Sequence, residues 1–282
     1  MTRPNPTFRR RQLGRQLRRL REELGFSREE IASYLGCQLP KMSKIETGKL
    51  GVSPAELRLL LIKYDVPDEE AEEMIDLGKE SRKQGWWVSF GDVVPIWLSD
   101  YVGFESEAET IYSYEAELLH GLLQTEGYAR AVIRAWPGAD ADHEDRGVRL
   151  RAARQEVLTR NPPVNYVAIV NEAALCRSVG GPATMRQQLE RLLDVMKLPN
   201  VTLRVLPLSA GAHPGMGSSF TILHMPGQSD PVVYLEELTT AAYLEKEHEV
   251  APYKLVFDRL QDVALSERDT RKLVAEKIKE VV

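Results

Sequence analysis

The chain has 282 residues, 43% of them hydrophobic and 28% charged, with 37 lysines and arginines against 42 aspartates and glutamates. This length fits about two domains of ordinary size, and the apolar fraction excludes a disordered or collagen-like chain. No apolar run approaches the roughly 18 residues of a membrane helix, the first eight residues lack the apolar core of a secretory signal, and Cys37 and Cys176 give neither a disulfide framework nor a metal-ligand spacing. We therefore expect a cytoplasmic protein without a membrane partner, a metal or a cofactor.

The net charge of −5 hides an uneven distribution along the chain. Residues 1–49 contain twelve lysines and arginines against five acidic residues, a charge of +7. Residues 50–282 hold the remaining 25 basic and 37 acidic residues, a charge of −12. This asymmetry is expected of a chain in which one module binds a polyanion and the rest stays away from it.

The first 82 residues predict an all-α module. Between residues 13 and 24, leucine recurs at spacings of four, three and four, which places one apolar stripe on a helix. Ser27 and Glu30 have the spacing of a capping box, and Pro40 and Pro54 suit the first turn of a helix. The expected helices lie at about 8–24, 28–35, 39–47, 54–64 and 68–82.

The second and third of these helices are joined by a turn that contains Gly36 and are braced by helices on both sides, which is typical of a helix-turn-helix module. In such a module the later helix lies in the major groove, where lysine can bind guanine and glutamine can bind adenine, while other basic side chains bind phosphates. The predicted DNA-binding residues are Gln38, Leu39, Pro40, Lys41, Ser43 and Lys44, with Thr47, Lys49, Arg9, Arg10, Arg11, Ser27 and Arg28 around them.

These residues resemble a known family. The stretches 25–36 and 41–49 are similar to the phage Cro/C1-type (XRE) helix-turn-helix, and Ser43-Lys-Ile-Glu-Thr-Gly-Lys49 is the most specific part. Actinobacterial members often have Ser-Pro-Ser-Lys where this chain has Gln38-Leu-Pro-Lys41, and Leu39 can contact a thymine methyl group. The resemblance implies a double-stranded DNA operator as partner. The alternative is a protein-docking module whose basic face is merely solvated.

The rest of the chain predicts a second kind of domain. Residues 84–100 form an aromatic, glycine-containing linker between a DNA-binding domain at 1–83 and a sensing or dimerisation domain at 101–282. Helices are expected at about 126–136, 140–160, 182–196, 243–260 and 267–281, and strands at 164–170, 201–206, 220–223 and 232–235, whereas residues 96–114 have a mixed pattern. This order predicts an α+β or mixed α/β domain with a sheet of about four strands.

Five ordered motifs in this domain resemble the antitoxin-like XRE regulators of actinobacteria. They are Gly121-Leu-Leu-Gln-Thr-Glu-Gly-Tyr-Ala-Arg130, Arg154-Gln-Glu-Val-Leu158, Asn171-Glu-Ala-Ala-Leu175, Gly211-Ala-His-Pro-Gly215 and Val233-Tyr-Leu-Glu236. That family usually has a proline before Gly-Leu-Leu-Gln-Thr, where this chain has His120. The resemblance implies transcriptional control, often together with a small partner protein encoded nearby.

The candidate ligand-binding or partner-binding residues of the second domain are His213, Glu172, Glu236 and Gln124. A histidine with carboxylates can serve acid–base chemistry, hold a metal or line a ligand pocket, and it can equally be an ordinary turn histidine. The sequence contains no nucleophile elbow, Walker loop, zinc-binding His pair or dinucleotide fingerprint, so we expect no enzyme and no metal site.

Three functions remain open at this point. The first is a sequence-specific transcriptional regulator that acts as a homodimer and responds to a small partner protein or a small-molecule effector. The second is an antitoxin-like protein that mainly sequesters a small partner and whose DNA binding is autoregulatory. The third is an enzyme with an attached DNA-binding domain, which is the least expected of the three.

Overall fold

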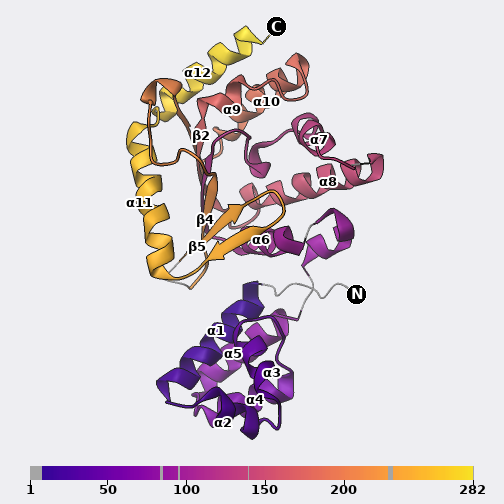
Figure 1. The fold of residues 1–282 in the computed structure, drawn as a ribbon, viewed down its shortest axis with the longest axis vertical. Coiled ribbons are helices and arrows are strands. Elements are labelled where there is room, and N and C mark those ends of the chain that lie inside the picture. Colours follow the sequence, from indigo (N-terminus) through magenta and orange to yellow (C-terminus); the bar gives the residue numbers. More distant parts are fainter. Residues whose placement is uncertain (1–7, 83–84, 95, 139, 228–230, 282) are drawn as a thin grey trace. The chain divides into compact units, whose positions relative to one another are not determined.

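The structure is a computed structural model, and it describes residues 8–82, 85–94, 96–138, 140–227 and 231–281. The first seven residues, in which we expect no secretory signal, lie outside the described residues. The chain divides into two compact units, residues 1–89 and residues 90–282 (Figure 1). We describe each unit by itself.

Unit 1 is helical, as predicted. Its helices are α1 (Phe8–Glu23), α2 (Arg28–Tyr34), α3 (Leu39–Glu46), α4 (Pro54–Lys63) and α5 (Asp68–Glu80). The predicted capping box is present at the start of α2, where Ser27 accepts from the Glu30 amide and Glu30 accepts from the Ser27 amide; a second one opens α4. Fully buried apolar side chains from different helices, such as Leu17 of α1, Ile31 of α2 and Leu60 of α4, form one core.

Two glycines allow α1 and α3 to approach closely. A Cβ atom on Gly14 of α1 would lie 2.4 Å from the carbonyl oxygen of Ile45, which is closer than real side chains come. Gly48, just after α3, has a positive φ of 68°, and a Cβ there would lie 2.7 Å from the Cα atom of Arg11. The C-terminal end of α3 is therefore packed directly against the backbone of α1.

The first structured segment after unit 1's helices is a 3-10 turn, η1 (Trp86–Val93), and α6 (Ile96–Glu107) follows it. The predicted linker at 84–100 thus contains η1 and the start of α6. The predicted mixed pattern of residues 96–114 resolves into α6 and then a strand, β1 (Thr110–Glu115).

Unit 2 is a mixed α/β domain built on one sheet, as predicted, but the sheet has six strands rather than about four. The strands are β1, β2 (Asn165–Asn171), β3 (Val201–Leu206), β4 (Phe220–His224), β5 (Val232–Glu236) and β6 (Ala241–Leu244), in the order β3-β2-β1-β4-β5-β6. Strands β1, β2 and β3 are parallel, whereas β4, β5 and β6 join by antiparallel pairing. The two strands missing from the prediction are β1, which lies in the middle of the sheet, and β6, which lies at its edge.

Both misses have physical causes. Strand β1 gains its stability from partners more than 50 residues away in sequence, and the sequence around it does not show these partners. Strand β6 is short and begins with two alanines, which favour helix over strand, so residues 243–260 read as one helix. In the structure that helix, α11 (Glu247–Val263), begins only after β6 has ended.

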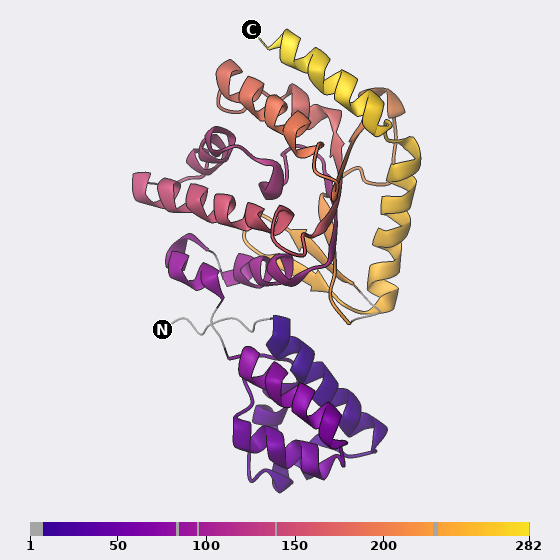
Figure 2. The same cartoon turned by 180° about the vertical axis from the view of Figure 1, so that it is seen from behind.

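Helices cover both faces of the sheet (Figures 1 and 2). Phe257 and Leu260 of α11 pack on one face, against Tyr114, Ile169 and other buried strand residues. The other face carries α6, α7 (Glu126–Arg134) and α8 (Ala141–Arg154), with the 3-10 turns η2 (Gly121–Leu123) and η3 (Gln155–Leu158) between them. Helix α12 (Glu267–Glu280) contacts α10 (Pro182–Val195) and β3; the short elements α9 (Glu172–Cys176) and η4 (Leu208–Ala210) follow β2 and β3.

We expect Gly14→Ala to destabilise unit 1 by about 1–3 kcal/mol, because the added methyl group has no space beside α3. Hydrogen–deuterium exchange of the full chain should show faster exchange in α1 and α3 and unchanged exchange in β3. Gly51→Ala is the matched control, since the nearest atom to a Cβ there is 3.6 Å away, an ordinary contact. Equal exchange in the two variants would show that the close approach of α1 to α3 at Gly14 does not limit the stability of unit 1.

Candidate functional site

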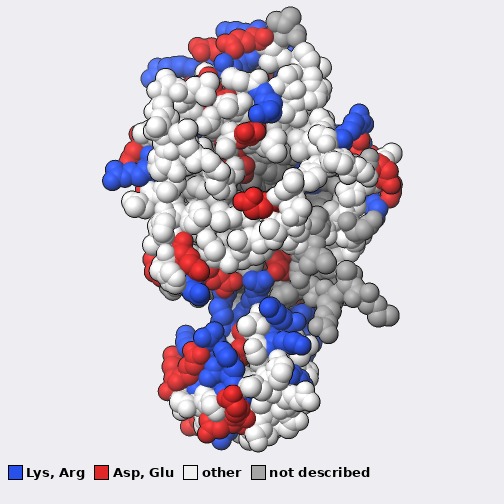
Figure 3. All heavy atoms as spheres, viewed as in Figure 1, with Lys and Arg blue, Asp and Glu red and all other residues white. Residues whose placement is uncertain are grey.

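Helix α3 presents one polar face and buries the other. Gln38, Leu39, Pro40, Lys44 and Thr47 are exposed, whereas Met42, Ile45 and Glu46 of the same helix are buried. Among the other residues predicted for DNA, Lys49 and Ser27 are exposed, and Ser43 and Arg28 are half-buried. The predicted reading surface is thus largely open to a partner, and Figure 3 shows many lysine and arginine atoms on unit 1.

A buried carboxylate fixes the position of α3. Glu46 is 2% exposed and accepts hydrogen bonds from Arg21 of α1, whose Nε lies 2.5 Å from Oε1 and whose Nη2 lies 3.1 Å from Oε2. Arg28, at the start of α2, donates from Nε to Glu46 Oε2 at 2.8 Å. Arg21 also donates to the backbone oxygen of Phe26, in the turn between α1 and α2, at 2.8 Å. The hydrogen bond to Glu46 raises the pKa of Arg21, so the guanidinium stays charged.

This network gives Arg28 a structural role, whatever contact it makes to DNA. Its guanidinium is held by Glu46 and therefore orients α2 against α3 rather than standing free for DNA. Ser27 likewise caps α2, and the Thr47 hydroxyl donates to the backbone oxygen of Ser43 at 2.8 Å. Each of these groups shapes the surface, and their predicted direct contacts to phosphate stay predictions.

Lys41, the lysine predicted to read a base, is engaged within unit 1. Its ammonium group forms an ion pair with Glu56, the carboxylate that completes the capping box of α4. Lys41 is half-buried, and its hydrogen bond to Glu56 raises its pKa. A contact to guanine would first require that this pair open, because α4 begins directly beside α3.

The arginine cluster at the start of α1 is also engaged within unit 1. Arg9 donates to Glu80 of α5 at 2.6 Å, and Arg10 reaches the backbone oxygen of Ser81 at 3.4 Å. Arg11 lies beside Gly48 at the end of α3. These contacts arise because the first turn of α1 packs along the last turn of α5. They place Arg9 and Arg10 on the α5 side of α1, and the phosphate contacts that we predict for them stay predictions.

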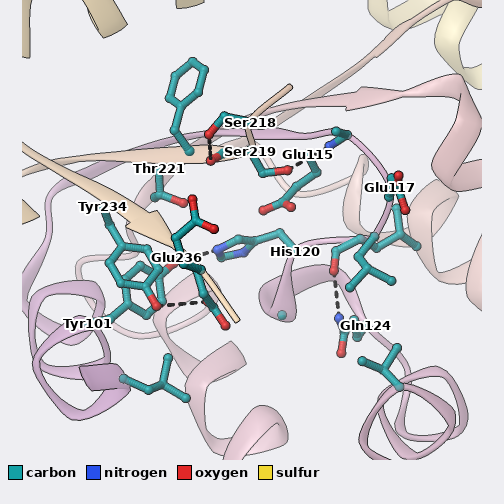
Figure 4. Close-up of a pocket in the computed structure, with 18 of the residues that line it drawn as sticks. Tyr101, Glu115, Glu117, His120, Gln124, Ser218, Ser219, Thr221, Tyr234 and Glu236 are labelled. Atoms are coloured by element: carbon teal, nitrogen blue, oxygen red, sulfur yellow. Dashed lines mark hydrogen bonds between the residues drawn. The ribbon is translucent and has the colours of Figure 1, made fainter. Parts of the chain in front are cut away.

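Unit 2 contains a cavity of about 590 Å³ at the carboxyl ends of β1 and β5. Its walls come from the end of β1 and the loop after it, from α8, and from the adjoining ends of β4 and β5. The described face of unit 2 in Figure 3 is hollowed, with acidic side chains at the border of the hollow. Figure 4 shows the side chains of Glu115, His120 and Glu236 arranged around one common space.

Strand register explains why Glu115 and Glu236 meet here. Tyr114 pairs with Phe220, and Thr221 pairs with Tyr234. Extending the pairing of β1 with β4 by one position places Glu115 opposite residue 219. Extending the pairing of β4 with β5 by two positions places Glu236 opposite the same residue, so both glutamates lie on the same face of the sheet. The two strands lie on either side of β4, so the two Cα atoms are separated by about two strand spacings, or roughly 10 Å. The carboxylates therefore flank a space wide enough for a small group.

A buried ion pair forms the floor of the cavity. Arg154, the last residue of α8, donates from Nε to Glu105 Oε1 at 2.7 Å and from Nη2 to Oε2 at 2.9 Å. Glu105 is 1% exposed and lies on α6, so this bidentate pair joins the two helices. The guanidinium also lies over the ring of Tyr101, 5.3 Å from its centroid.

His120 is a neutral, structural histidine. Burial lowers its pKa to about 4. Its Nδ1 accepts from the Leu122 amide at 3.3 Å, so in the neutral ring Nε2 carries the hydrogen and donates to the Tyr101 hydroxyl, 2.7 Å away. Nδ1 thereby caps η2.

The structure brings together only two of the four predicted ligand residues of unit 2. Glu236 and Gln124 line the cavity. Glu172 is outside its lining, where it accepts from the Leu208 amide at 3.0 Å and pairs with Lys277 at 3.5 Å. His213 is also outside and packs edge-on against Tyr114, with ring centroids 5.9 Å apart. The cavity thus includes Glu236 and Gln124 but not His213 or Glu172, and a ligand or partner role for any of the four residues stays a prediction.

Sequence reasoning missed most of the other polar residues of the cavity, among them Tyr101, Glu115, His120, Arg151 and Arg154. One signal was available for Glu115, which ends the alternating stretch Thr110-Ile-Tyr-Ser-Tyr-Glu115 as a carboxylate at a strand end. Within the described ranges, no group of three or more His, Cys, Asp or Glu side chains is placed to hold a metal ion. In the same ranges no helix has both the length and the apolar character needed to cross a bilayer.

We expect Lys44→Ala to weaken DNA binding and to reduce the slope of log affinity against log salt by about one, as loss of one phosphate contact does. Lys41→Met should change the slope less, because Glu56 already neutralises Lys41. Binding of sonicated genomic DNA at several salt concentrations measures both effects. Lys79→Ala, which removes an exposed lysine of α5, is the control; an equal loss in this variant would show that the effect is not specific to α3.

The stability of unit 2 should depend on the protonation of Glu115. Burial and the nearby charge of Glu236 raise the pKa of Glu115 from 4.5 to about 8. Between these two values the folded state holds a proton that the unfolded state has released, so stability falls as pH rises from about 5 to 8. Glu115→Gln should remove this loss of stability. The melting temperature of the variant minus that of the wild type should therefore increase as pH rises. Glu190→Gln on α10 serves as control; parallel pH curves for wild type and Glu115→Gln would contradict the assignment.

Comparison with known families follows the division into units. Residues 12–74 match the family model described as a helix-turn-helix domain, which confirms the predicted type of the first domain. Residues 98–276, more than half of the chain, match the model described as a domain of unknown function, DUF5753. No curated protein and no solved structure matches the chain. The chain therefore belongs to the DUF5753 family and carries at its N-terminal end the helix-turn-helix domain of a DNA-binding regulator.

Proposed function

We propose that the protein is a cytoplasmic, sequence-specific transcriptional regulator that binds its operator as a dimer and whose unit 2 receives a signal by binding a small ligand in its cavity. The observation that carries the proposal is the exposed polar face of α3, held rigidly by Glu46 between α1 and α2. Base readout depends on such a helix being presented at a fixed angle to the groove.

The side chains at the two ends of α3 suit different contacts to DNA, to bases at its start and to phosphates at its end. Gln38, at the N-terminal end of the helix, is exposed and can pair with adenine, and Leu39, 39% exposed, can contact a thymine methyl group. Lys44 and Lys49 are exposed cations at the other end and in the following turn, where phosphate contacts are expected. Specific readout is thus assigned to the first turn of α3 and electrostatic attraction to its end.

The cavity supports binding rather than catalysis as the role of unit 2. Its volume lies within the range of about 300–1,000 Å³ that small-molecule sites occupy. In the described part of its wall, the hydroxyl groups of Ser218 and Ser219 contact backbone atoms, and His120 is bonded to Tyr101. A histidine base paired with a hydroxyl nucleophile is therefore not assembled there, which supports a regulator over an enzyme.

A second candidate is the capture of a small partner protein, in the manner of an antitoxin. The observation that favours it is a set of exposed apolar side chains in the lining of the cavity: Leu118 is 41% exposed, Trp136 48% and Leu238 72%. Exposed apolar groups gathered around a hollow are typical of surfaces that bind other proteins. In this version DNA binding would serve control of the protein's own gene.

Capture of genomic DNA fragments by the purified full chain tests the proposed function. The enriched fragments should share an inverted repeat, with half-sites whose centres lie about one helical turn, or roughly 34 Å, apart. Gln38→Ala should relax the sequence preference, whereas Lys79→Ala should leave it unchanged. A preference without two-fold symmetry would contradict the dimer. No preference over shuffled competitor, with or without cell extract, would refute the regulator.

A further inference from the structure

The cavity of unit 2 has an excess of negative charge that the protein does not neutralise. Two charged groups in or near its lining are already paired, since Glu117 binds Arg177 at 3.0 Å and Arg154 binds Glu105. Three carboxylates of the lining, those of Glu115, Glu236 and Glu237, form no ion pair with any described residue. Arg151 is the single unpaired guanidinium of the described lining, and Glu115 holds a proton at neutral pH because its pKa is raised to about 8, so the balance is two negative groups against one positive group.

The two central carboxylates are held in place. Glu115 is half-buried at the end of β1, and Glu236 accepts from the Tyr234 hydroxyl at 2.9 Å. Because both residues stand opposite position 219 on one face of the sheet, a positive group between them can reach both. This arrangement is set by strand register and is not a chance gathering of surface side chains.

Aromatic rings form the wall beside these carboxylates. Tyr101 and Tyr234 pack with ring centroids 4.2 Å apart, and Trp136 lines the cavity with 48% of its surface exposed. Aromatic faces attract organic cations and also bury their apolar parts. The wall therefore suits a ligand that joins a positive group to an apolar or aromatic body.

An unused acceptor points the same way. Gln124 also lines the cavity and is 5% exposed; its Nε2 donates to the Leu119 carbonyl at 2.7 Å, while its Oε1 has no hydrogen-bond partner among the described residues. A buried acceptor without a donor is costly, so it favours a partner that donates hydrogen bonds. A protonated amine donates and cannot accept.

We propose that the cavity of unit 2 binds a small organic cation, an amine attached to an apolar or aromatic body, with the ammonium group between Glu115 and Glu236. This inference rests on the proposed role of unit 2 as a ligand-binding domain and names the class of ligand. Anionic ligands are disfavoured, because they would have to approach the unpaired carboxylates of Glu236 and Glu237 with the help of Arg151 alone.

Three probes of nearly equal size test the proposal by calorimetry on the full chain without DNA. Tyramine carries an ammonium group, 4-ethylphenol is its neutral counterpart, and 4-hydroxyphenylacetate is its anionic counterpart. Tyramine should bind at least tenfold more tightly than either counterpart at neutral pH, the factor expected of one charge-assisted hydrogen bond. Glu115→Gln and Glu236→Gln should each remove most of this preference, while Glu190→Gln should retain it.

Circular dichroism and melting curves establish whether the variants fold. Glu236 is exposed, so Glu236→Gln remains informative even where Glu115→Gln disturbs the fold. Equal binding of tyramine and 4-ethylphenol, tighter binding of the anion, or no heat from tyramine at millimolar concentration would overturn the proposal. If the full chain binds its operator but does not prefer tyramine over the other two probes, only the proposed ligand class is refuted. Intact tyramine binding with no DNA preference would refute only the regulator.

Discussion

The recognition helix of this protein depends on one buried carboxylate. Glu46 sits at the end of α3 and is held by Arg21 from α1 and by Arg28 from α2. Removing one partner of such a buried pair leaves a charge without compensation, which costs several kcal/mol in known cases. The close approach of α1 to α3 at Gly14 adds a steric constraint to the electrostatic one. Together they fix the helix from two sides and leave its outer face free.

A buried ion pair also joins two helices of unit 2. Arg154 and Glu105 join α8 to α6 underneath the cavity, and Tyr101 lies against the guanidinium. The pair keeps the floor of the cavity polar while it stays internally neutral. The carboxyl groups of Glu115 and Glu236, at the ends of β1 and β5, also line this cavity and form no ion pair with a described residue. The fold thus places a buried, internally neutral ion pair and two carboxyl groups without an ion-pair partner among the described residues in the lining of one cavity.

The helices of unit 1 were predictable because their signals are local. The spacing of Ser27 and Glu30, and the leucine stripe of α1, need no information from elsewhere in the chain. Burial of Met42 and Ile45 also follows from the period of the helix. The sequence could not show that Lys41 would pair with Glu56, since this contact depends on where α4 starts in space.

The cavity of unit 2 was predictable only in part, because it depends on non-local pairing. Glu236 and Gln124 were found through motifs, but Glu115 lies on a central strand whose partners are distant in sequence. His213 drew attention by its glycine-rich loop and packs on the other side of the sheet, against Tyr114. Alternation along a strand shows which of its residues share a face of the sheet. Only the order of the strands shows which residues of different strands become neighbours on that face.

The independence of the outer face of α3 has a consequence for how such proteins diversify. Gln38, Leu39 and Lys44 contribute little to the core, and exchanges at exposed positions usually change stability by less than about 0.5 kcal/mol. Duplicated copies of the gene can therefore acquire new target sites by changing these positions without first gaining spare stability. Lys41 is the exception, because its replacement also alters the start of α4, and divergence there should be accompanied by change at Glu56.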